Sequence, residues 1–204
     1  MNGVPTRLLP QTQGRCIAPL AMLPSQPSAD RVSTPHAGRP IVLVGLMGAG
    51  KSTVGRRLAA RLHVPFVDAD DEIVAAAGMS IADIFDRFGE AYFRDGERRV
   101  IARLMDGTRK VIATGGGAFI QDDTRALILT TATAVWLDAD TNVLADRVKR
   151  RDTRPLLRGK DPRVVLAELA RLRNPFYAMA PIRVPSHHAP HDLTVTAILK
   201  ALDL

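Results

Sequence analysis

Short apolar runs alternate with helical patterns from residue 40 to the end of the chain. The first run, residues 41–44, is continuous, as a strand buried on both faces of a sheet requires, and the stretches between the runs repeat apolar residues at helical spacing. The patterns predict strands at residues 41–44, 65–67, 110–113, 132–137 and 182–184, and helices at residues 51–62, 71–77, 80–88, 91–105, 124–129, 142–151, 162–179 and 194–202. Strands that alternate with helices predict an α/β fold, with a five-stranded parallel sheet and helices on both faces.

The first 39 residues lack this alternation. Residues 1–40 hold seven of the 14 prolines, no aromatic residue and a single acid, Asp30. This composition predicts a disordered tail over residues 1–39 and one folded domain over residues 40–204. A dispensable tail is the preferred interpretation; an organelle transit peptide and a true start at Met22 are the alternatives.

Composition narrows the classes of protein that fit. The chain has no apolar run of about 18 residues, so no transmembrane helix is expected. Its single cysteine, Cys16, excludes an intrachain disulfide framework. The net charge of +7 indicates either an anionic ligand or a solvated basic surface, and the 4% aromatic content disfavours a nucleic-acid platform. We expect a cytoplasmic monomer that binds neither nucleic acid nor membrane.

A phosphate-binding motif follows the first predicted strand. Residues 45–52 (Gly-Leu-Met-Gly-Ala-Gly-Lys-Ser) fit G-x-x-x-x-G-K-[ST], and the next predicted helix opens at the lysine. Lys51 is expected to reach the β- and γ-phosphates of a nucleoside triphosphate, and the Ser52 hydroxyl to bind Mg²⁺. The candidate nucleotide-binding residues here are Gly48, Ala49, Gly50, Lys51, Ser52 and Thr53.

Two carboxylates follow the second predicted strand. Asp68 and Asp70 stand at i and i+2, which places them on opposite sides of an extended chain and suggests separate roles. The alternative is that one of them caps a helix that begins near Asp71. The guanine-reading motif N-K-x-D is absent, so a kinase of small metabolites or nucleotides fits better than a GTPase.

These motifs, with four others, resemble those of the shikimate kinase family in their order along residues 40–182. They are residues 45–53, 66–70 (Phe-Val-Asp-Ala-Asp), 89–97 (Gly-Glu-Ala-Tyr-Phe-Arg-Asp-Gly-Glu), 114–117 (Thr-Gly-Gly-Gly), 154–157 (Arg-Pro-Leu-Leu) and 173–177 (Arg-Asn-Pro-Phe-Tyr). The resemblance implies a P-loop fold of the nucleoside monophosphate kinase type, with a mobile lid at about residues 150–162. It also implies Mg²⁺-dependent transfer of the γ-phosphoryl group of ATP to the 3-hydroxyl of shikimate.

The resemblance assigns roles on the acceptor side of this reaction. Asp70 matches the carboxylate that binds the ring hydroxyls and acts as base, and Asp68 matches the one near Mg²⁺. Arg94 and Arg173 match the arginines that hold the substrate carboxylate, which suits the forked guanidinium. Gly116 matches a glycine whose N–H approaches the substrate, where a side chain would displace it.

The resemblance also assigns roles to three residues that support these groups. Arg154 matches the lid arginine that reaches the transferring phosphoryl group, so Lys51, Asp70 and Arg154 form the candidate catalytic set. Arg147 matches an arginine packed against adenine. Glu97 lies three residues after Arg94 and either braces it or forms a surface ion pair.

The end of the chain departs from the family pattern. His187, His188 and His191 follow the last predicted strand, where relatives have an adenine-contacting loop. The three histidines suggest either a metal site or a flexible loop, and the loop is preferred because no carboxylate or cysteine spacing completes a ligand set. The alternative functions are a gluconate kinase-like enzyme and a non-catalytic nucleotide or shikimate sensor, although a sensor need not keep Lys51 and Asp70.

Removing residues 1–38 is expected to leave the melting temperature and the turnover nearly unchanged, because the predicted tail has little apolar surface to bury. Thermal unfolding and a coupled ADP-release assay on the shortened and full chains would measure this. A large loss of soluble protein or of turnover would show that part of the segment packs on the domain.

Overall fold

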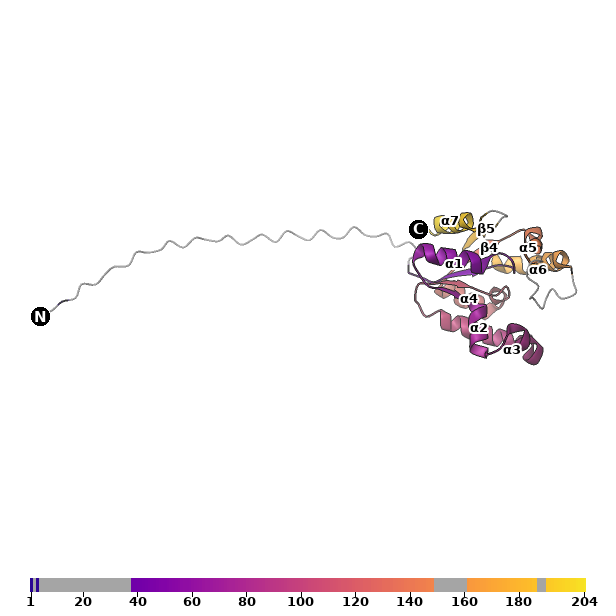
Figure 1. Ribbon diagram of the computed structural model, residues 1–204, viewed down its shortest axis with the longest axis horizontal. Helices are drawn as coiled ribbons and strands as arrows, with labels where there is room; N and C mark the ends of the chain where they lie inside the picture. The colour runs from indigo at the N-terminus through magenta and orange to yellow at the C-terminus, as the bar shows by residue number, and fades with distance from the viewer. Residues whose placement is uncertain (2, 4–37, 149–160, 187–189) are drawn as a thin grey trace. The chain divides into compact units, whose positions relative to one another are not determined.

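A five-stranded parallel sheet forms the centre of the folded domain (Figure 1). The computed structural model describes residues 1, 3, 38–148, 161–186 and 190–204. The chain divides into two units, Met1–Val32 and Ser33–Leu204, and the fold described is that of the second. Its strands are β1 (Ile41–Val44), β2 (Phe66–Asp68), β3 (Val111–Ala113), β4 (Thr133–Asp138) and β5 (Ile182–Pro185), in the order β2-β3-β1-β4-β5. The predicted fold class is therefore confirmed.

The helices form two groups around the sheet. They are α1 (Lys51–Leu62), α2 (Ala69–Ala77), α3 (Ile81–Leu104), α4 (Asp122–Thr131), α5 (Thr141–Val148), α6 (Pro162–Tyr177) and α7 (His191–Ala201), with a 3-10 turn η1 (Ala118–Ile120). Helices α1 and α7 pack together, whereas α3, α4 and α6 all contact η1. Right-handed crossovers between parallel strands account for this division. Helices α2 and α3 lie side by side and extend below α4 in Figure 1.

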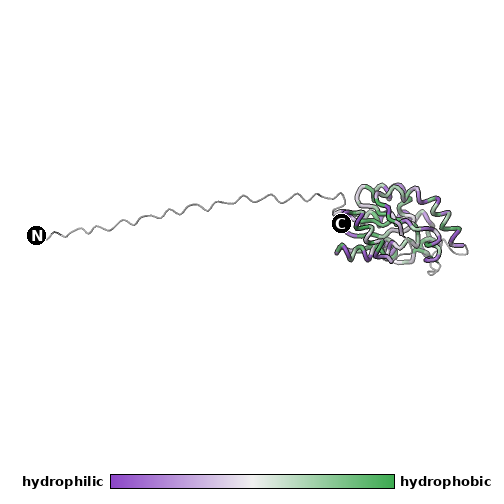
Figure 2. The backbone as a smooth tube through the Cα atoms, turned by 90° about the horizontal axis from the view of Figure 1, so that it is seen from above, coloured by the Kyte–Doolittle hydropathy of each residue, from purple (hydrophilic) through white to green (hydrophobic). Residues whose placement is uncertain are grey.

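Burial explains why the central strands contain continuous apolar runs. All residues of β1 and β3 are buried, because each strand has neighbours on both edges and helices over the sheet. Figure 2 shows the resulting distribution, with hydrophobic segments inside the domain and hydrophilic ones on its outer helices. Because the strands themselves are buried, the side chains that can bind a ligand are those that follow each strand at the carboxyl edge of the sheet.

Strand register brings three loops together at that edge. Leu43 of β1 and Asp68 of β2 both lie opposite Ala113 of β3. The Thr114 hydroxyl, one residue later, donates to the carbonyl of Leu43 at 3.0 Å. The loops that follow β1, β2 and β3 therefore begin next to one another, as ligand sites of open α/β sheets require.

Local signals account for several helix starts, and many helix boundaries differ from the prediction by one to three residues. Ser80 caps α3 through the backbone N–H of Asp83 at 3.1 Å, and Asp161 caps α6 ahead of Pro162. Helix α2 begins at residue 69 rather than 71 and α7 at 191 rather than 194, while η1 was not predicted. The two helices predicted at 80–88 and 91–105 form one element, interrupted at Gly89.

Two predictions fall mainly outside the described residues. The tail at residues 1–39 is described only at residues 1, 3, 38 and 39, and the lid at residues 150–162 only at its end, where Asp161 and Pro162 begin α6. Both remain predictions. Among the helices of the described part, none is long and apolar enough to cross a membrane.

Gly89→Ala is expected to lower the free energy of unfolding by about 1–3 kcal/mol. Gly89 has φ 79° and ψ 176°, which is a conformation that essentially only glycine adopts. Gly96→Ala is the matched control, because Gly96 lies in the same element and a Cβ there meets no atom within 4 Å. That control should raise stability by about 0.5–1 kcal/mol. Urea denaturation measures both, and equal stabilities would show that the interruption carries no strain.

Candidate active site

The phosphate loop (residues 45–52) connects β1 to α1 and wraps around the side chain of Lys51. Gly45, Gly48 and Gly50 all have positive φ, of which Gly50, at 93°, is the N-cap of α1. Lys51 is 9% exposed, and its Nζ donates to the carbonyls of Gly45 at 2.7 Å and Leu46 at 2.9 Å. A buried ammonium beside the N-terminus of a helix makes this loop electropositive, as binding of a polyphosphate requires.

Ser52 and Asp68 form the second part of the site. The Ser52 hydroxyl donates to Asp68 Oδ2 at 2.6 Å, so the start of α1 is tied to the end of β2. Hydroxyl and carboxylate oxygens are the donors that Mg²⁺ prefers, and this pair lies at the mouth of the phosphate loop. The donor chemistry therefore fits the predicted metal position at Ser52 and Asp68.

The sequence predicted an extended chain at Asp70, and this prediction is wrong, because Asp70 lies in a helix. Helix α2 begins at Ala69, and Asp68 is its N-cap, whose carboxylate accepts from the N–H of Asp70 at 3.2 Å. The capping role proposed for one carboxylate therefore belongs to Asp68. Asp70 stands in the first helical turn, and this turn directs it toward Gly115 rather than to the other side of a strand.

Arg94 and Glu97 form an ion pair on one face of α3. Arg94 Nη1 lies 2.8 Å from Glu97 Oε2, and its Nη2 lies 3.0 Å from Glu90 Oε1. Burial by itself lowers the pKa of Arg94, but the two carboxylates outweigh this and raise it. The guanidinium therefore keeps its charge and is held at a defined orientation.

Glu97 is a buried carboxylate, so of the two alternatives the brace of Arg94 is confirmed and the surface ion pair is excluded. Its side chain is 2% exposed. Burial raises its pKa and the charge of Asp70 adds to this, whereas Arg94 and Arg173 oppose it. Among the described residues, its Oε1 has no hydrogen-bond partner. Glu97 thus braces Arg94 with one oxygen and leaves the other toward Asp70.

The glycine loop (residues 114–117) approaches these charged groups closely. A Cβ on Gly115 would lie 2.9 Å from both Asp70 Oδ1 and Glu97 Oε1, and one on Gly117 would lie 2.7 Å from Arg94 Cζ. At Gly116 the nearest atoms would be 3.5 Å away, an ordinary contact. Within the protein, the crowding is therefore at Gly115 and Gly117, and the predicted clash of a Gly116 side chain with the substrate stays a prediction.

Helix α6 contributes Arg173 and Tyr177, which both bind the carbonyl of Gly116. Arg173 Nη1 donates to that oxygen at 3.0 Å, and the Tyr177 hydroxyl donates to it as well. Tyr177 is fully buried, its ring packs near Trp136, and burial raises its pKa to about 12. Sequence reasoning missed this role, although the spacing of four residues from Arg173 places both side chains on one helix face.

Arg147 lies on the outer side of the phosphate loop. Its Nη1 donates to the carbonyl of Gly48 and to the Ser186 hydroxyl, both at 3.4 Å, and Ser186 donates to the carbonyl of Ala49 at 3.2 Å. Burial lowers the pKa of Arg147. Arg154 lies outside the described residues, so its lid role remains a prediction.

The structure brings most of the predicted site residues to one edge of the sheet. Asp70, Arg94, Gly116 and Arg173 gather around the glycine loop. Lys51, Ser52 and Asp68 gather at the neighbouring phosphate loop. Two carboxylates and two guanidiniums thus stand beside a polyphosphate site, an arrangement that suits a small acceptor bearing hydroxyl and carboxylate groups.

Tyr177→Phe is expected to lower the free energy of unfolding by about 0.5–1.5 kcal/mol at neutral pH, because one donor to a buried carbonyl is lost. The effect should shrink above pH 10. An unfolded tyrosine ionises near pH 10 and folded Tyr177 at about 12, so its contribution to stability is complete below pH 10 and lost toward pH 12. Urea denaturation across this range measures the slope, with Tyr92→Phe as the exposed control. If the free energy of unfolding of Tyr177→Phe and of the parent changed with pH in the same way, the hydroxyl of Tyr177 would not stabilise the fold as a buried donor.

Comparison with known sequences agrees with this geometry. A family model described as Shikimate kinase matches residues 47–203. A shikimate kinase of Novosphingobium aromaticivorans is 57% identical over 188 residues, which cover 90% of this chain and 96% of that protein. One of Caulobacter vibrioides is 60% identical over 168 residues, which cover 82% of this chain and 84% of that protein.

Comparison with solved structures gives the same result. The shikimate kinase from Acinetobacter baumannii in complex with shikimate has a TM-score of 0.78 and 35% identity, and the match covers 82% of this chain and 95% of that one. A gluconokinase from Sinorhizobium meliloti, with a TM-score of 0.54, 21% identity and coverage of 82% and 93%, shares the fold alone. This chain belongs to the shikimate kinase family of phosphotransferases.

Proposed function

We propose that this chain transfers the γ-phosphoryl group of ATP to the 3-hydroxyl of shikimate, giving shikimate 3-phosphate and ADP. The observation that carries the proposal is the convergence of Asp70, Glu97, Arg94 and Arg173 on the glycine loop, directly beside the phosphate loop. Shikimate is a small ring with one carboxylate and three hydroxyls. It therefore needs cationic forks at one end and a hydroxyl acceptor at the other.

On the acceptor side, Arg94 and Arg173 bind the ring carboxylate and Asp70 binds the hydroxyls. Arg94 is oriented by Glu97 at 2.8 Å, and Arg173 by the Gly116 carbonyl at 3.0 Å, so neither guanidinium has to be ordered by the substrate. Asp70 accepts the proton of the 3-hydroxyl as that oxygen attacks phosphorus. The N–H of Gly116 approaches the substrate from the glycine loop.

On the donor side, the phosphate loop binds the polyphosphate through its backbone N–H groups, from Gly48 to Thr53. Lys51 supplies positive charge to the β- and γ-phosphates. Ser52 and Asp68 would hold Mg²⁺, which would supply positive charge to offset the negative charge of the phosphates. We assign Arg147 to the adenine side and Arg154, which lies outside the described residues, to the transferred phosphoryl group.

The two alternative functions receive less support. The likeness to a gluconokinase is one of fold, and it carries no argument about the acceptor. A non-catalytic sensor would not need Lys51 within its loop or Asp70 beside the glycine loop, and the chain has both. The monomeric state and the cytoplasmic location expected from the sequence stay predictions.

Asp70→Asn is expected to lower kcat for shikimate by about 10²–10⁴-fold while ATP binding is kept, because an amide of nearly equal shape cannot accept the hydroxyl proton. A coupled ADP-release assay measures the rate, and calorimetry measures nucleotide binding. Asp71→Asn is the matched control, since Asp71 is the next residue and its side chain is 78% exposed. Shikimate, gluconate and nucleoside monophosphates are compared as acceptors.

Two outcomes would contradict the proposal. Turnover with gluconate or a nucleoside monophosphate in preference to shikimate would overturn the assignment of the acceptor. Near-normal kcat in Asp70→Asn would remove Asp70 as the base and leave it only a role in orienting the ring.

A further inference from the structure

A cavity of about 390 Å³ lies between α2 and α3, and the proposed reaction does not use it. Its volume falls within the range of pockets that bind small molecules. The buried part of its wall is apolar and comes from both helices: Ile73 of α2, and Ile84, Phe93 and Val100 of α3. A ligand with an apolar body would therefore bind here by removing this surface from water.

The cavity lies on a different face of α3 from the predicted acceptor site. Phe93, Gly96 and Val100 line the cavity, and their spacing of three and four residues places them on one side of the helix. Arg94 and Glu97, which face the glycine loop, each follow a cavity residue by one position and stand about 100° further around the helix. Phe93 is shared, because it lines the cavity while its ring centroid lies 5.1 Å from Cζ of Arg94. Arg94 itself is not part of the wall, so a ligand in the cavity would leave it free to bind the acceptor.

Two guanidiniums stand at the mouth of the cavity. Arg99 and Arg103 both line it, four residues apart on α3, and their side chains are 64% and 60% exposed. Arg99 Nη2 pairs with Asp95 and Arg103 Nη2 with Glu72, each at 2.8 Å. Exposed ion pairs of this kind contribute little to stability, and a guanidinium has five N–H donors, so both arginines can also bind an anion. The mouth of the cavity is therefore suited to a carboxylate.

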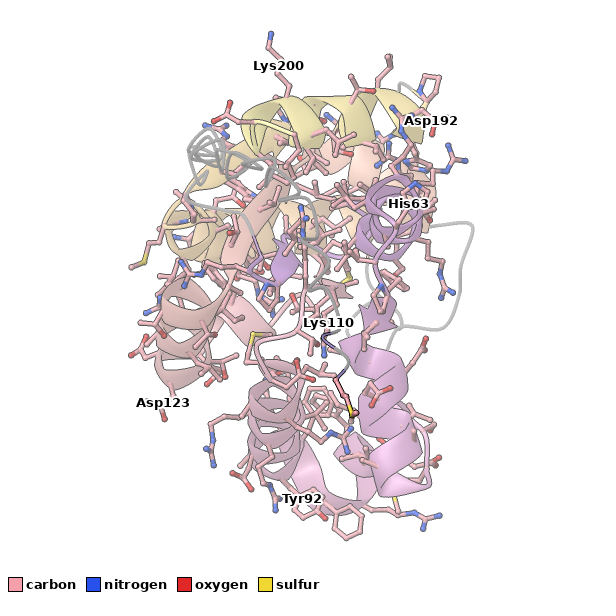
Figure 3. The ribbon with its side chains drawn as sticks, turned by 90° about the vertical axis from the view of Figure 1, so that its left-hand side faces the viewer. His63, Tyr92, Lys110, Asp123, Asp192 and Lys200 are labelled. Atoms are coloured by element: carbon pink, nitrogen blue, oxygen red, sulfur yellow. The ribbon has the colours of Figure 1, made fainter. Side chains whose placement is uncertain are left out.

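Aromatic side chains extend the apolar wall toward the solvent. Tyr92 lines the cavity and is 52% exposed, and its ring lies 4.8 Å from that of Phe88, which is 49% exposed. Figure 3 shows Tyr92 on the opposite side of the domain from Asp192 and Lys200 of α7. An exposed aromatic pair beside an apolar cavity is typical of a binding surface, and this one lies away from α7, the helix that packs on α1.

We propose that the cavity between α2 and α3 is a second ligand site, which binds a small aromatic carboxylate. The ring lies on Ile73, Ile84 and Phe93, and the carboxylate binds Arg99 and Arg103 at the mouth. An apolar floor below two guanidiniums selects an anion with a flat apolar body over a cation or a fully polar molecule. The site is independent of the proposed function, because its wall includes none of the residues assigned to the reaction.

The probe for this site is 2-naphthoate, whose fluorescence reports its binding to the full chain, and 2-naphthamide is the uncharged comparison. We expect 2-naphthoate to bind with a Kd of about 0.01–1 mM, and the amide to bind at least about 5-fold more weakly. Saturating shikimate should change the Kd of 2-naphthoate by less than about 3-fold, because Asp70, Arg94 and Arg173 are not in the wall of the cavity.

Arg99→Gln tests the recognition of charge. This variant should bind 2-naphthoate about 5- to 20-fold more weakly than the parent, while its affinity for 2-naphthamide changes by less than about 2-fold. Arg98→Gln is the matched control, because Arg98 pairs with the same Asp95, at 2.7 Å, but does not line the cavity. This control should leave both affinities within about 2-fold of those of the parent.

Gly96→Leu tests the place of binding. A Cβ on Gly96 meets no atom within 4 Å, so a leucine side chain there has room to enter the cavity. We expect Gly96→Leu to lower the affinity for 2-naphthoate at least about 10-fold, because the side chain occupies the volume that the ring needs. Gly96→Ala adds a single carbon and should stay within about 3-fold of the parent. Circular dichroism checks that both variants are folded.

Four results would overturn the inference. The first is no binding of 2-naphthoate to the parent, and the second is equal binding to the parent and to folded Gly96→Leu. The third is loss of binding in saturating shikimate, which would place the probe in the acceptor site. The fourth is a dimer in sedimentation velocity that Tyr92→Ser dissociates, which would assign this surface to a second copy of the chain. Failure of the parent to phosphorylate shikimate, with 2-naphthoate still bound, would overturn the proposed function alone.

Discussion

The parallel pairing of β3 between β1 and β2 is the constraint on which the site depends. Leu43 and Asp68 share the register position of Ala113, so three chain segments leave the sheet side by side. The hydroxyl of Thr114 then binds back to the carbonyl of Leu43, which starts the glycine loop next to the phosphate loop. Donor and acceptor sites are neighbours because the strands that precede them are neighbours.

Close backbone approach is the second requirement, and it is met by residues 115–117. Two carboxylates and a guanidinium occupy the volume in which side chains of Gly115 and Gly117 would otherwise stand. The buried carboxylate of Glu97 is tolerated there because Arg94 compensates its charge at 2.8 Å, and Arg173 adds to this. Helix α6 fixes the glycine loop, because Tyr177 and Arg173 on one face of this helix both donate to the carbonyl of Gly116.

The phosphate loop is supported from outside as well as by its own turn. Arg147 of α5 binds the carbonyl of Gly48, and Ser186, just after β5, binds that of Ala49. His191 of α7 lies next to Gly50. These side chains therefore lie beside the phosphate loop, whereas α3 and α6 contribute the side chains around the glycine loop. The division follows the strand order, because β5 lies at the opposite edge of the sheet from β2.

The amino-acid sequence by itself determined the α/β class and the phosphate-loop motif, and it selected Asp68, Asp70, Arg94 and Arg173 as candidate site residues. It could do so because continuous apolar runs report burial and because glycine, lysine and arginine at these spacings have few other uses. Tertiary structure alone decided that Glu97 is buried, that Tyr177 binds the Gly116 carbonyl and that His191 lies on Gly50. The last two contacts join elements that only packing brings together, so neither periodicity nor a local motif relates their residues. Spacing does relate Glu97 to Arg94 on one helix, but whether that helix face is buried depends on what packs against it.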